Sequence, residues 1–194
     1  MCIRDSYYKQ YRYGWYQICS KILGYSECNL IQVPIYMQFK LVLNDTFDKY
    51  NCGEFDKKEN DTISVSKSNF SHETDEVNVM ISDTYPLSLS QLPEIKKNIP
   101  TLLISRNNTN DVNRYDSPEL VRCVVNEVRS LNNNIKKVNV YATTNPLNTK
   151  NIASSAFKLG GRDNFNEVRV FQQERDGIRT VSYTHLTLPT IYSV

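Results

Sequence analysis

Short polar side chains gather at three places where an apolar run of the sequence ends. These clusters are Ser82-Asp83-Thr84-Tyr85, Ser105-Arg106-Asn107-Asn108 and Thr143-Thr144-Asn145. Hydroxyl and amide groups suit hydrogen bonds to sugars and base edges, and the guanidinium of Arg106 suits a phosphate. The same residue types also favour turns and helix caps, so a purely structural role is the competing interpretation.

Carboxylates offer a second possible chemistry. Asp83 stands in the first cluster, and Asp111 and Asp116 lie in an Asn-rich stretch. A strand-end acid could serve as base or nucleophile toward a nucleoside or sugar, or it could cap the turn that follows. We favour the cap for Asp83 and keep the catalytic role as the alternative.

Other chemistries find little support. Neither GxGxxG after a strand nor GxxxxGK[ST] occurs, which weighs against NAD enzymes and NTPases. The cysteines lack CxxC spacing, and Cys123 fits a small core residue of a helix. His72, next to Glu73 in a polar stretch, fits a solvated loop. The sequence therefore predicts no cofactor and no metal site, and it assigns no role to Cys19, Cys28 or Cys52.

Four short apolar runs predict the strands that would position these clusters. They cover residues 77–81, 99–104, 138–142 and 168–171. The first two runs are joined by a stretch in which Pro93 permits only a short helix. Strands that alternate with helices indicate right-handed βαβ units, so the expected fold is α/β with a Rossmann-like, mainly parallel sheet. Ligands of such sheets bind beyond the carboxyl ends of the strands, where the three clusters lie.

Two helices are predicted between the later strands. An apolar stripe with helical spacing comprises Val121, Val124, Val125, Val128, Leu131 and Ile135. Asp116 or Ser117 would cap this helix, with Pro118 in its first turn. The second helix would bury Ile152, Ala153, Ala156 and Phe157, with Asn148 or Thr149 as its cap and Gly160-Gly161 as its stop.

Residues 7–76 predict a partial β-rich segment followed by a polar linker. Apolar residues from Tyr36 to Leu43 favour strands, with Pro34 at a strand edge or bulge, and residues 16–23 favour a short helix. The polar linker would hold one short strand near residues 63–65. The expected division is therefore 7–76 for this segment and 77–180 for a truncated Rossmann-like domain.

Composition narrows the range of partners. The 194 residues carry 23 basic and 21 acidic side chains, a net charge of +2. Near-neutral charge argues against binding to long nucleic acid, where a clustered basic face is expected. No run approaches the roughly 18 apolar residues of a membrane span. We therefore expect a cytoplasmic protein with no direct nucleic-acid partner and no membrane partner.

The two ends of the chain are expected not to belong to the natural protein. Residues 1–5 read Met-Cys-Ile-Arg-Asp and residues 181–185 read Val-Ser-Tyr-Thr-His. Codons can be chosen so that the two segments are one DNA sequence read on opposite strands. Both ends resemble a translated sequencing adapter, which predicts that residues 1–6 and 181–194 are artefacts and that both natural ends are missing.

The part from residue 77 to residue 180 resembles the SAVED family of bacterial antiphage defence, whose domains are similar to two fused CARF-type Rossmann-like units. The resemblance is carried by the strand at 77–82, the segment 92–104 and above all Val138-Asn139-Val140-Tyr141-Ala142-Thr143-Thr144-Asn145-Pro146. Ala156-Phe157-Lys158-Leu159-Gly160 and a strand ending at Phe171 follow it. The polar Asn148-Thr149-Lys150-Asn151 departs from the expected pattern.

This resemblance implies a sensor that binds a cyclic oligonucleotide and activates a linked effector by forming homo-oligomers. Arg106, Thr143, Thr144 and Asn145 would contact the ligand, and Tyr85 could stack on a base. Two hypotheses therefore stand: a non-catalytic sensing module, and a small Rossmann-like enzyme acting on nucleosides or sugars through Asp83.

Overall fold

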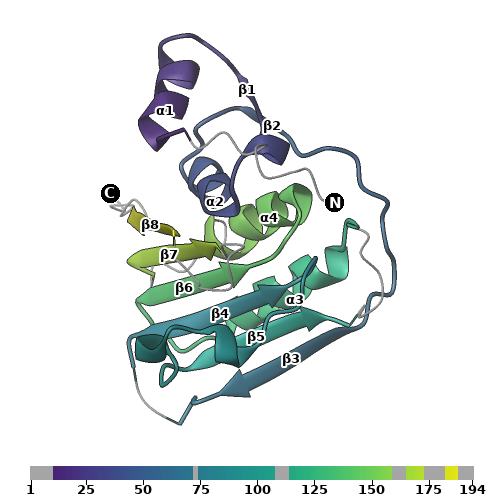
Figure 1. Ribbon diagram of the computed structural model, residues 1–194, viewed down its shortest axis with the longest axis vertical. Helices are drawn as coiled ribbons and strands as arrows, with labels where there is room; N and C mark the ends of the chain where they lie inside the picture. Colours follow the sequence, from purple (N-terminus) through teal and green to yellow (C-terminus); the bar gives the residue numbers. More distant parts are fainter. Residues whose placement is uncertain (1–10, 72–73, 108–113, 159–164, 173–181, 188–194) are drawn as a thin grey trace, which may run out of the picture.

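A six-stranded sheet forms the centre of the computed structural model, which describes residues 11–71, 74–107, 114–158, 165–172 and 182–187 (Figure 1). The strand order is β3-β5-β4-β6-β7-β8. The strands are β3 (Ile63–Ser68), β4 (Glu76–Ser82), β5 (Thr101–Arg106), β6 (Lys137–Ala142), β7 (Glu167–Gln172) and β8 (Ser182–Thr187). The remaining elements are α1 (Tyr13–Lys21), β1 (Glu27–Asn29), η1 (Leu30–Gln32), α2 (Ile35–Leu43), β2 (Lys49–Asn51), η2 (Leu89–Gln91), η3 (Glu94–Lys96), α3 (Pro118–Arg129), α4 (Pro146–Ile152) and the π-helical stretch η4 (Ala153–Lys158).

The four inner strands run parallel, in the order β5-β4-β6-β7, and the outer strands β3 and β8 are antiparallel to their neighbours. Val79 pairs with Leu102 on one side and with Val140 on the other. All four strands predicted from the sequence are present. The expected α/β class with a Rossmann-like, mainly parallel sheet is therefore confirmed.

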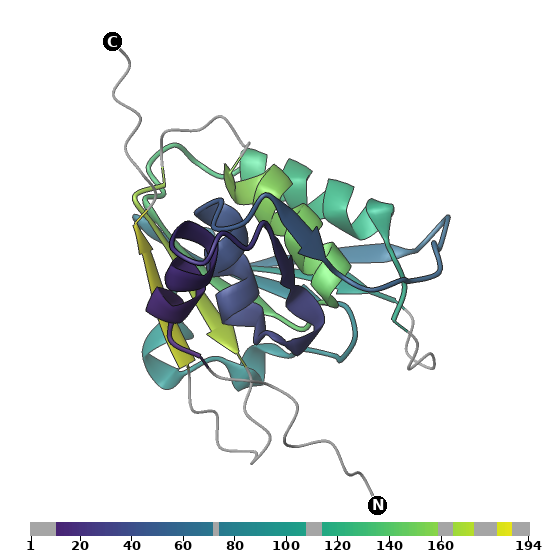
Figure 2. The ribbon, with the colours of Figure 1, turned by 90° about the horizontal axis from the view of Figure 1, so that it is seen from above.

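Helices cover one face of the sheet, and a short connection covers part of the other (Figure 2). Seen from above, α3 and α4 lie on one side, whereas the segment with η2 and η3 lies on the opposite side. The apolar stripe of α3 faces the core as predicted, with Val124 and Val128 almost fully buried. The brief η3 after Pro93 agrees with the prediction that this proline allows only a short helix. Among the described residues, no helix has the length and apolar character needed to cross a bilayer.

The strand prediction for residues 36–43 is wrong, because this stretch forms α2. Pro34 precedes the first turn as the residue before the helix and does not lie at a strand edge. The alternating large residues suggested one buried face, but Gln38 and Val42 are buried as well. A helix enclosed on nearly all sides has no polar stripe, so its sequence does not show a helical period. Helix α2 packs against α4, η4, β7 and β8. The short helix expected at 16–23 is present as α1, and the strand near 63–65 is β3.

The cap predicted for the last helix is also wrong. Helix α4 begins at Pro146, and Asn145 caps it by accepting a hydrogen bond from the Asn148 backbone N–H at 2.9 Å. Asn148 and Thr149 therefore lie inside the helix, where both are fully buried. Proline at the first helical position was the signal for this earlier start. The predicted stop at Gly160-Gly161 lies outside the described residues.

Strand β8 falls within the stretch 181–194 that the sequence predicts to be an artefact. It pairs antiparallel with β7, from Gln172 opposite Ser182 to Glu167 opposite Thr187. An edge strand offers unpaired backbone groups to any extended segment of suitable length. Pairing of this kind is therefore compatible with either origin of the segment, and the assignment of both ends stays a prediction.

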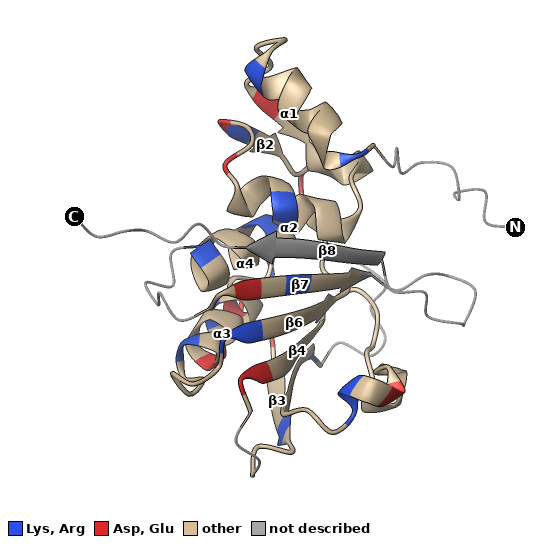
Figure 3. Ribbon diagram, turned by 90° about the vertical axis from the view of Figure 1, so that its left-hand side faces the viewer, with Lys and Arg blue, Asp and Glu red and all other residues tan. Residues whose placement is uncertain are grey.

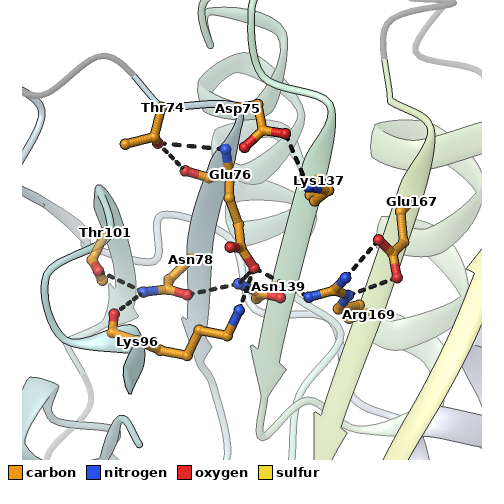
Figure 4. A network of polar contacts seen from close by, with 10 residues as sticks. All are labelled: Thr74, Asp75, Glu76, Asn78, Lys96, Thr101, Lys137, Asn139, Glu167 and Arg169. Carbon is orange, nitrogen blue, oxygen red and sulfur yellow. Dashed lines mark hydrogen bonds and ion pairs between the residues drawn. The ribbon is translucent and has the colours of Figure 1, made fainter. Parts of the chain in front are cut away.

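The partly covered face of the sheet carries a network of charged and amide side chains near the amino ends of its parallel strands (Figure 4). Glu76 Oε1 accepts hydrogen bonds from Lys96 Nζ at 2.5 Å and from Asn139 Nδ2 at 2.8 Å, and Arg169 Nη1 lies 3.3 Å away. Burial raises the pKa of Glu76, but these donors and charges outweigh burial and hold the pKa below its ordinary value. The ionised carboxylate therefore joins β4, β6, β7 and the η3 segment.

We expect Glu76→Gln to lower the free energy of unfolding by about 1.5–3 kcal/mol near neutral pH, the range for hydrogen bonds to charged groups. A lowered folded-state pKa gives stability that is present above the ordinary value of 4.5 and lost as pH falls through the folded pKa. Urea titrations at several pH values should therefore show the variant approaching the wild type in acid. Glu94→Gln, at an exposed carboxylate, is the matched control; a pH-independent gap at Glu76 would contradict the argument.

Candidate functional site

The carboxyl ends of β4, β5 and β6 lie side by side, since Ser82 pairs with Ser105 and Ile81 with Ala142. The sheet therefore brings together the three polar clusters that the sequence singled out. Their side chains differ in exposure. Arg106, Thr143, Thr144 and Asn145 are all buried, whereas Tyr85 is 55% exposed.

Arg106 lies between two carboxylates at this edge. Its Nε is 3.1 Å from Asp83 Oδ1, and its Nη1 is 3.7 Å from Asp61 Oδ2. All three side chains are only 1% exposed. A buried charge is stabilised only by a close partner of opposite charge, so the stability of this group depends on all three side chains. The Arg106 guanidinium also lies over the Tyr115 ring, 5.6 Å from its centroid.

Asn148 fixes the other side of Asp83. Its Nδ2 donates to Asp83 Oδ2 at 2.9 Å and to the Tyr115 carbonyl at 3.0 Å, and its Oδ1 accepts from the Ser117 backbone N–H at 3.2 Å. Asn145 contributes its backbone N–H to Asp83 Oδ2 at 3.4 Å and its Nδ2 to the Tyr115 carbonyl at 2.7 Å. Helix α4 is thereby bound to the end of β4 and to the start of α3.

Ser117 connects the Asp61 side of this group to the Asn148 side. Its hydroxyl donates to Asp61 Oδ2 at 2.7 Å and accepts from the Leu120 backbone N–H, which makes it the cap of α3. Of the two caps that the sequence offered for this helix, Ser117 is therefore the observed one. We refer to these side chains together as the strand-end network: Asp61, Asp83, Arg106, Tyr115, Ser117, Asn145 and Asn148.

Thr143 and Thr144 have separate partners. Thr143 Oγ1 donates to the Tyr85 carbonyl at 2.7 Å and accepts from the Asp83 backbone N–H at 3.2 Å. Thr144 Oγ1 lies 2.6 Å from Thr149 Oγ1 in the first turns of α4. Both hydroxyls therefore hold loop backbone and helix in place. Thr143 in particular fixes the turn that presents the Tyr85 ring to solvent.

The electrostatics of Asp83 follow from its position. Burial raises its pKa, while the Asn148 hydrogen bond and the Arg106 charge act in the opposite direction. One oxygen faces Arg106 and the other accepts from Asn148 and Asn145. A general base or nucleophile needs an oxygen that a substrate can reach, and a side chain 1% exposed does not offer one in this arrangement.

The sequence did not single out Asp61, Tyr115 or Asn148 as members of this site. Asp61 lies in the segment that precedes β3. Two backbone hydrogen bonds attach this segment to Asp116, in the loop before α3. The Lys58 N–H donates to the Asp116 carbonyl, and the Asp116 N–H donates to the Asp56 carbonyl, each at 3.0 Å. No local pattern signals an approach between segments so distant in sequence. Asn148 belongs to the polar stretch noted as a departure from the SAVED pattern, and its burial explains that departure.

Other candidates lie apart from this edge or outside the described residues. His72 and Asp111 are not described. The described residues include four cysteines, all of them free thiols: Cys19, Cys28, Cys52 and Cys123. Burial raises the pKa of Cys28 to about 11, so this thiol is not activated. Within the described ranges, no cluster of His, Cys, Asp and Glu could hold a metal ion.

Comparison with known families assigns the chain. The sequence profile of the SMODS- and Ubiquitin system-associated 2TM effector domain, SUa-2TM, matches residues 1–188. The chain belongs to the SUa-2TM family. No curated protein matches it. The strand-end network is thus found in a member of the SUa-2TM family, while the SAVED resemblance noted in the sequence concerns the fold.

Solved structures confirm that this SUa-2TM chain resembles SAVED/CARF domains in fold. It is similar to the Acinetobacter baumannii Cap4 SAVED/CARF-domain containing receptor, solved with the cyclic trinucleotides 2'3'3'-cAAA and 3'3'3'-cAAA. The TM-scores are 0.58 and 0.59, each at 12% sequence identity. The match covers 84% of this chain but only 38% of the receptor chain. The SUa-2TM chain therefore has a SAVED/CARF-like fold and spans well under half the length of these receptors.

Proposed function

We propose that this chain is a sensing module that binds a cyclic oligonucleotide at the carboxyl edge of its parallel sheet. One observation carries the proposal: three polar clusters meet at this edge, in a fold similar to that of receptors solved with cyclic trinucleotides. Ligands of open parallel sheets bind at this edge because the strand-end loops and helix amino ends converge there.

The residues of the edge have two different tasks in this proposal. Tyr85, which is exposed, stacks on a base of the ligand. Arg106, Thr143, Thr144 and Asn145 have internal partners, so they form the support that holds the ligand-facing loops. The Arg106 charge is balanced by the Asp61 and Asp83 carboxylates, so Arg106 stabilises the strand ends and does not itself contact a phosphate.

Binding is proposed to control a linked effector through homo-oligomerisation, in antiphage defence. The name of the family, an effector domain associated with SMODS and ubiquitin systems, supports this link. We place the domain in the cytoplasm, because its four described cysteines are free thiols, as is usual in a reducing compartment.

Tyr85→Ala is expected to weaken binding of a cyclic triadenylate by about 1–3 kcal/mol, the usual contribution of one stacked base. Calorimetric titration of the whole chain with 2'3'3'-cAAA and 3'3'3'-cAAA measures this loss, with a linear triadenylate as the ligand control. Tyr85→Phe retains the ring and should retain affinity. Leu89→Ala, at another exposed side chain on the same connection, is the matched control.

The titration also separates the competing hypotheses. Binding without ligand breakdown, accompanied by an increase in mass in light scattering, supports the sensor. Absence of binding by the folded chain to every cyclic oligonucleotide tried would contradict it. Breakdown of a nucleoside or sugar that Asp83→Asn abolishes would support the enzyme.

A further inference from the structure

Exposed apolar side chains are concentrated at the amino-terminal end of the described chain. Twelve large hydrophobic residues of the described part are exposed, and six of them fall between residues 11 and 25. These six are Tyr11, Trp15, Ile18, Ile22, Leu23 and Tyr25. Scattered apolar residues are normal on a protein surface, but a contiguous group marks a contact site.

Four of these residues lie along α1 and at its two ends: Trp15 and Ile18 are in the helix, Ile22 is its C-cap, and Tyr11 precedes the N-cap, with its ring centre 6.1 Å from that of Trp15. Tyr11, Trp15, Ile18 and Ile22 follow one another at intervals of four, three and four residues, and together they form what we call the outer stripe. In a helix with 3.6 residues per turn, the positions of Trp15, Ile18 and Ile22 fall within about 60° of one another, and the ring contact with Trp15 adds Tyr11 to the group. Ile22 is 75% exposed and Trp15 is 47% exposed, so nothing in the described chain covers the stripe.

The opposite side of α1 holds the helix on the rest of the protein. The Tyr13 hydroxyl lies 3.1 Å from Thr46 Oγ1, and Lys40 Nζ lies 4.7 Å from the centre of the Tyr13 ring. Tyr16 is buried in the core. Because this inner side is anchored, α1 is held in place at one end of the molecule, beyond α2 and the sheet (Figures 1 and 3).

The charge of the segment has one sign. Residues 6–26 contain Lys9, Arg12 and Lys21 but no Asp or Glu, and the first acidic residue is Glu27. Seven of these 21 residues are Tyr or Trp. Tyr and Trp combine an apolar ring with a polar group and concentrate at membrane–water interfaces, and Lys and Arg are attracted to anionic lipid.

A second copy of the chain fits this stripe less well than a lipid surface. The helix has nine residues, about 14 Å in length, whereas stable protein interfaces bury about 1,200 Å² or more. A membrane requires no shape complementarity and accepts a short, protruding helix. Helix α1 lies at one extremity of the molecule, where a flat surface can approach it (Figure 3).

We propose that the outer stripe of α1 docks on the surface of an anionic lipid membrane. The apolar side chains enter the interface while Arg12 and Lys21 face the lipid headgroups. The surface is distinct from the carboxyl edge of the sheet, so this inference does not rest on the proposed ligand. It replaces the expectation of no membrane partner with a peripheral contact.

Trp15 makes the proposal directly measurable, because it is the only tryptophan of the chain. Titration of the 194-residue protein with vesicles of phosphatidylcholine and phosphatidylglycerol should shift its emission to the blue and protect it from acrylamide. Flotation of the protein with the vesicles provides an independent readout. Arg12→Gln with Lys21→Gln should weaken binding to anionic vesicles about fivefold for each charge removed.

Ile18→Ser with Ile22→Ser keeps the fluorescent probe and should lower vesicle partitioning by about tenfold or more, since two apolar side chains are lost from the contact. Val65→Ser with Ile95→Ser removes two exposed apolar residues elsewhere and should leave binding unchanged. Urea unfolding confirms that both variants are folded. Absence of a blue shift, or equal loss in the control variant, would overturn the proposal. A blue shift that grows with protein concentration without lipid would assign the stripe to a second copy instead.

Discussion

Replacement of Arg106 by methionine is expected to lower the free energy of unfolding by about 3–5 kcal/mol, because it leaves two buried carboxylates without their cation. Asp61 and Asp83 are each 1% exposed and cannot turn to water. Without the Arg106 charge, which lowers the pKa of Asp83, burial holds that pKa still further above its ordinary value, so the folded variant binds a proton that the unfolded chain does not. The variant should therefore be least stable near neutral pH and recover part of its stability as pH falls.

Urea unfolding followed by circular dichroism measures this loss. Arg122→Met is the matched control, since the Arg122 side chain is 69% exposed and its removal should change stability by no more than about 0.5 kcal/mol. Adding Asp61→Asn and Asp83→Asn to Arg106→Met removes the stranded charges and should restore much of the loss. An Arg106→Met variant as stable as Arg122→Met would show that the buried group of three does not hold the strand ends together.

Phe39→Ala is the second change with a large expected effect, a loss of about 3–5 kcal/mol for a fully buried phenylalanine. Phe39 in α2 is 0% exposed and meets Phe157 edge to face, with ring centres 6.1 Å apart. It therefore joins the amino-terminal segment to the helices that cover the main sheet. If the two parts share one core, the variant should still unfold in a single transition at a lower urea concentration.

Phe70→Ala is the matched control for this truncation. Phe70 is 42% exposed, and its removal should alter stability by about 0.5 kcal/mol at most. Two separate transitions in the Phe39→Ala variant, with the later one unchanged from the wild type, would show that the segment before the main sheet unfolds independently.

Prediction from the sequence worked best where hydrophobic pattern and element length agree. The strands around Val79, Leu102, Val140 and Val170 are short apolar runs between polar turns, and all of them are present. Helix α3 was predicted because its sequence has an apolar stripe with helical spacing and, before it, a serine cap followed by proline. It worked least well for α2, where burial on nearly all sides conceals the helical period.

The candidate site divides in the same manner. Parallel strands place their carboxyl ends at one edge, so the sequence could predict that Asp83, Arg106 and Asn145 would meet there. It could not predict that Arg106 lies against Asp61, because that contact depends on where the chain before β3 crosses the sheet edge. The sequence could not predict which of these side chains are exposed to solvent either. Tyr85 is exposed and is therefore the proposed ligand contact, whereas the buried Arg106 and Asn145 support it.

Three properties can be recognised from the amino-acid sequence alone: the class of the fold, the set of polar residues at the carboxyl edge of the sheet, and the basic, aromatic character of the amino-terminal segment. These properties follow from local patterns that a chain carries whatever its tertiary contacts. The pairing of the polar groups and the exposure of the apolar side chains become visible only in the folded chain. Burial and pairing depend on segments distant in sequence, and the cost of an unpaired buried charge then fixes what each residue can do.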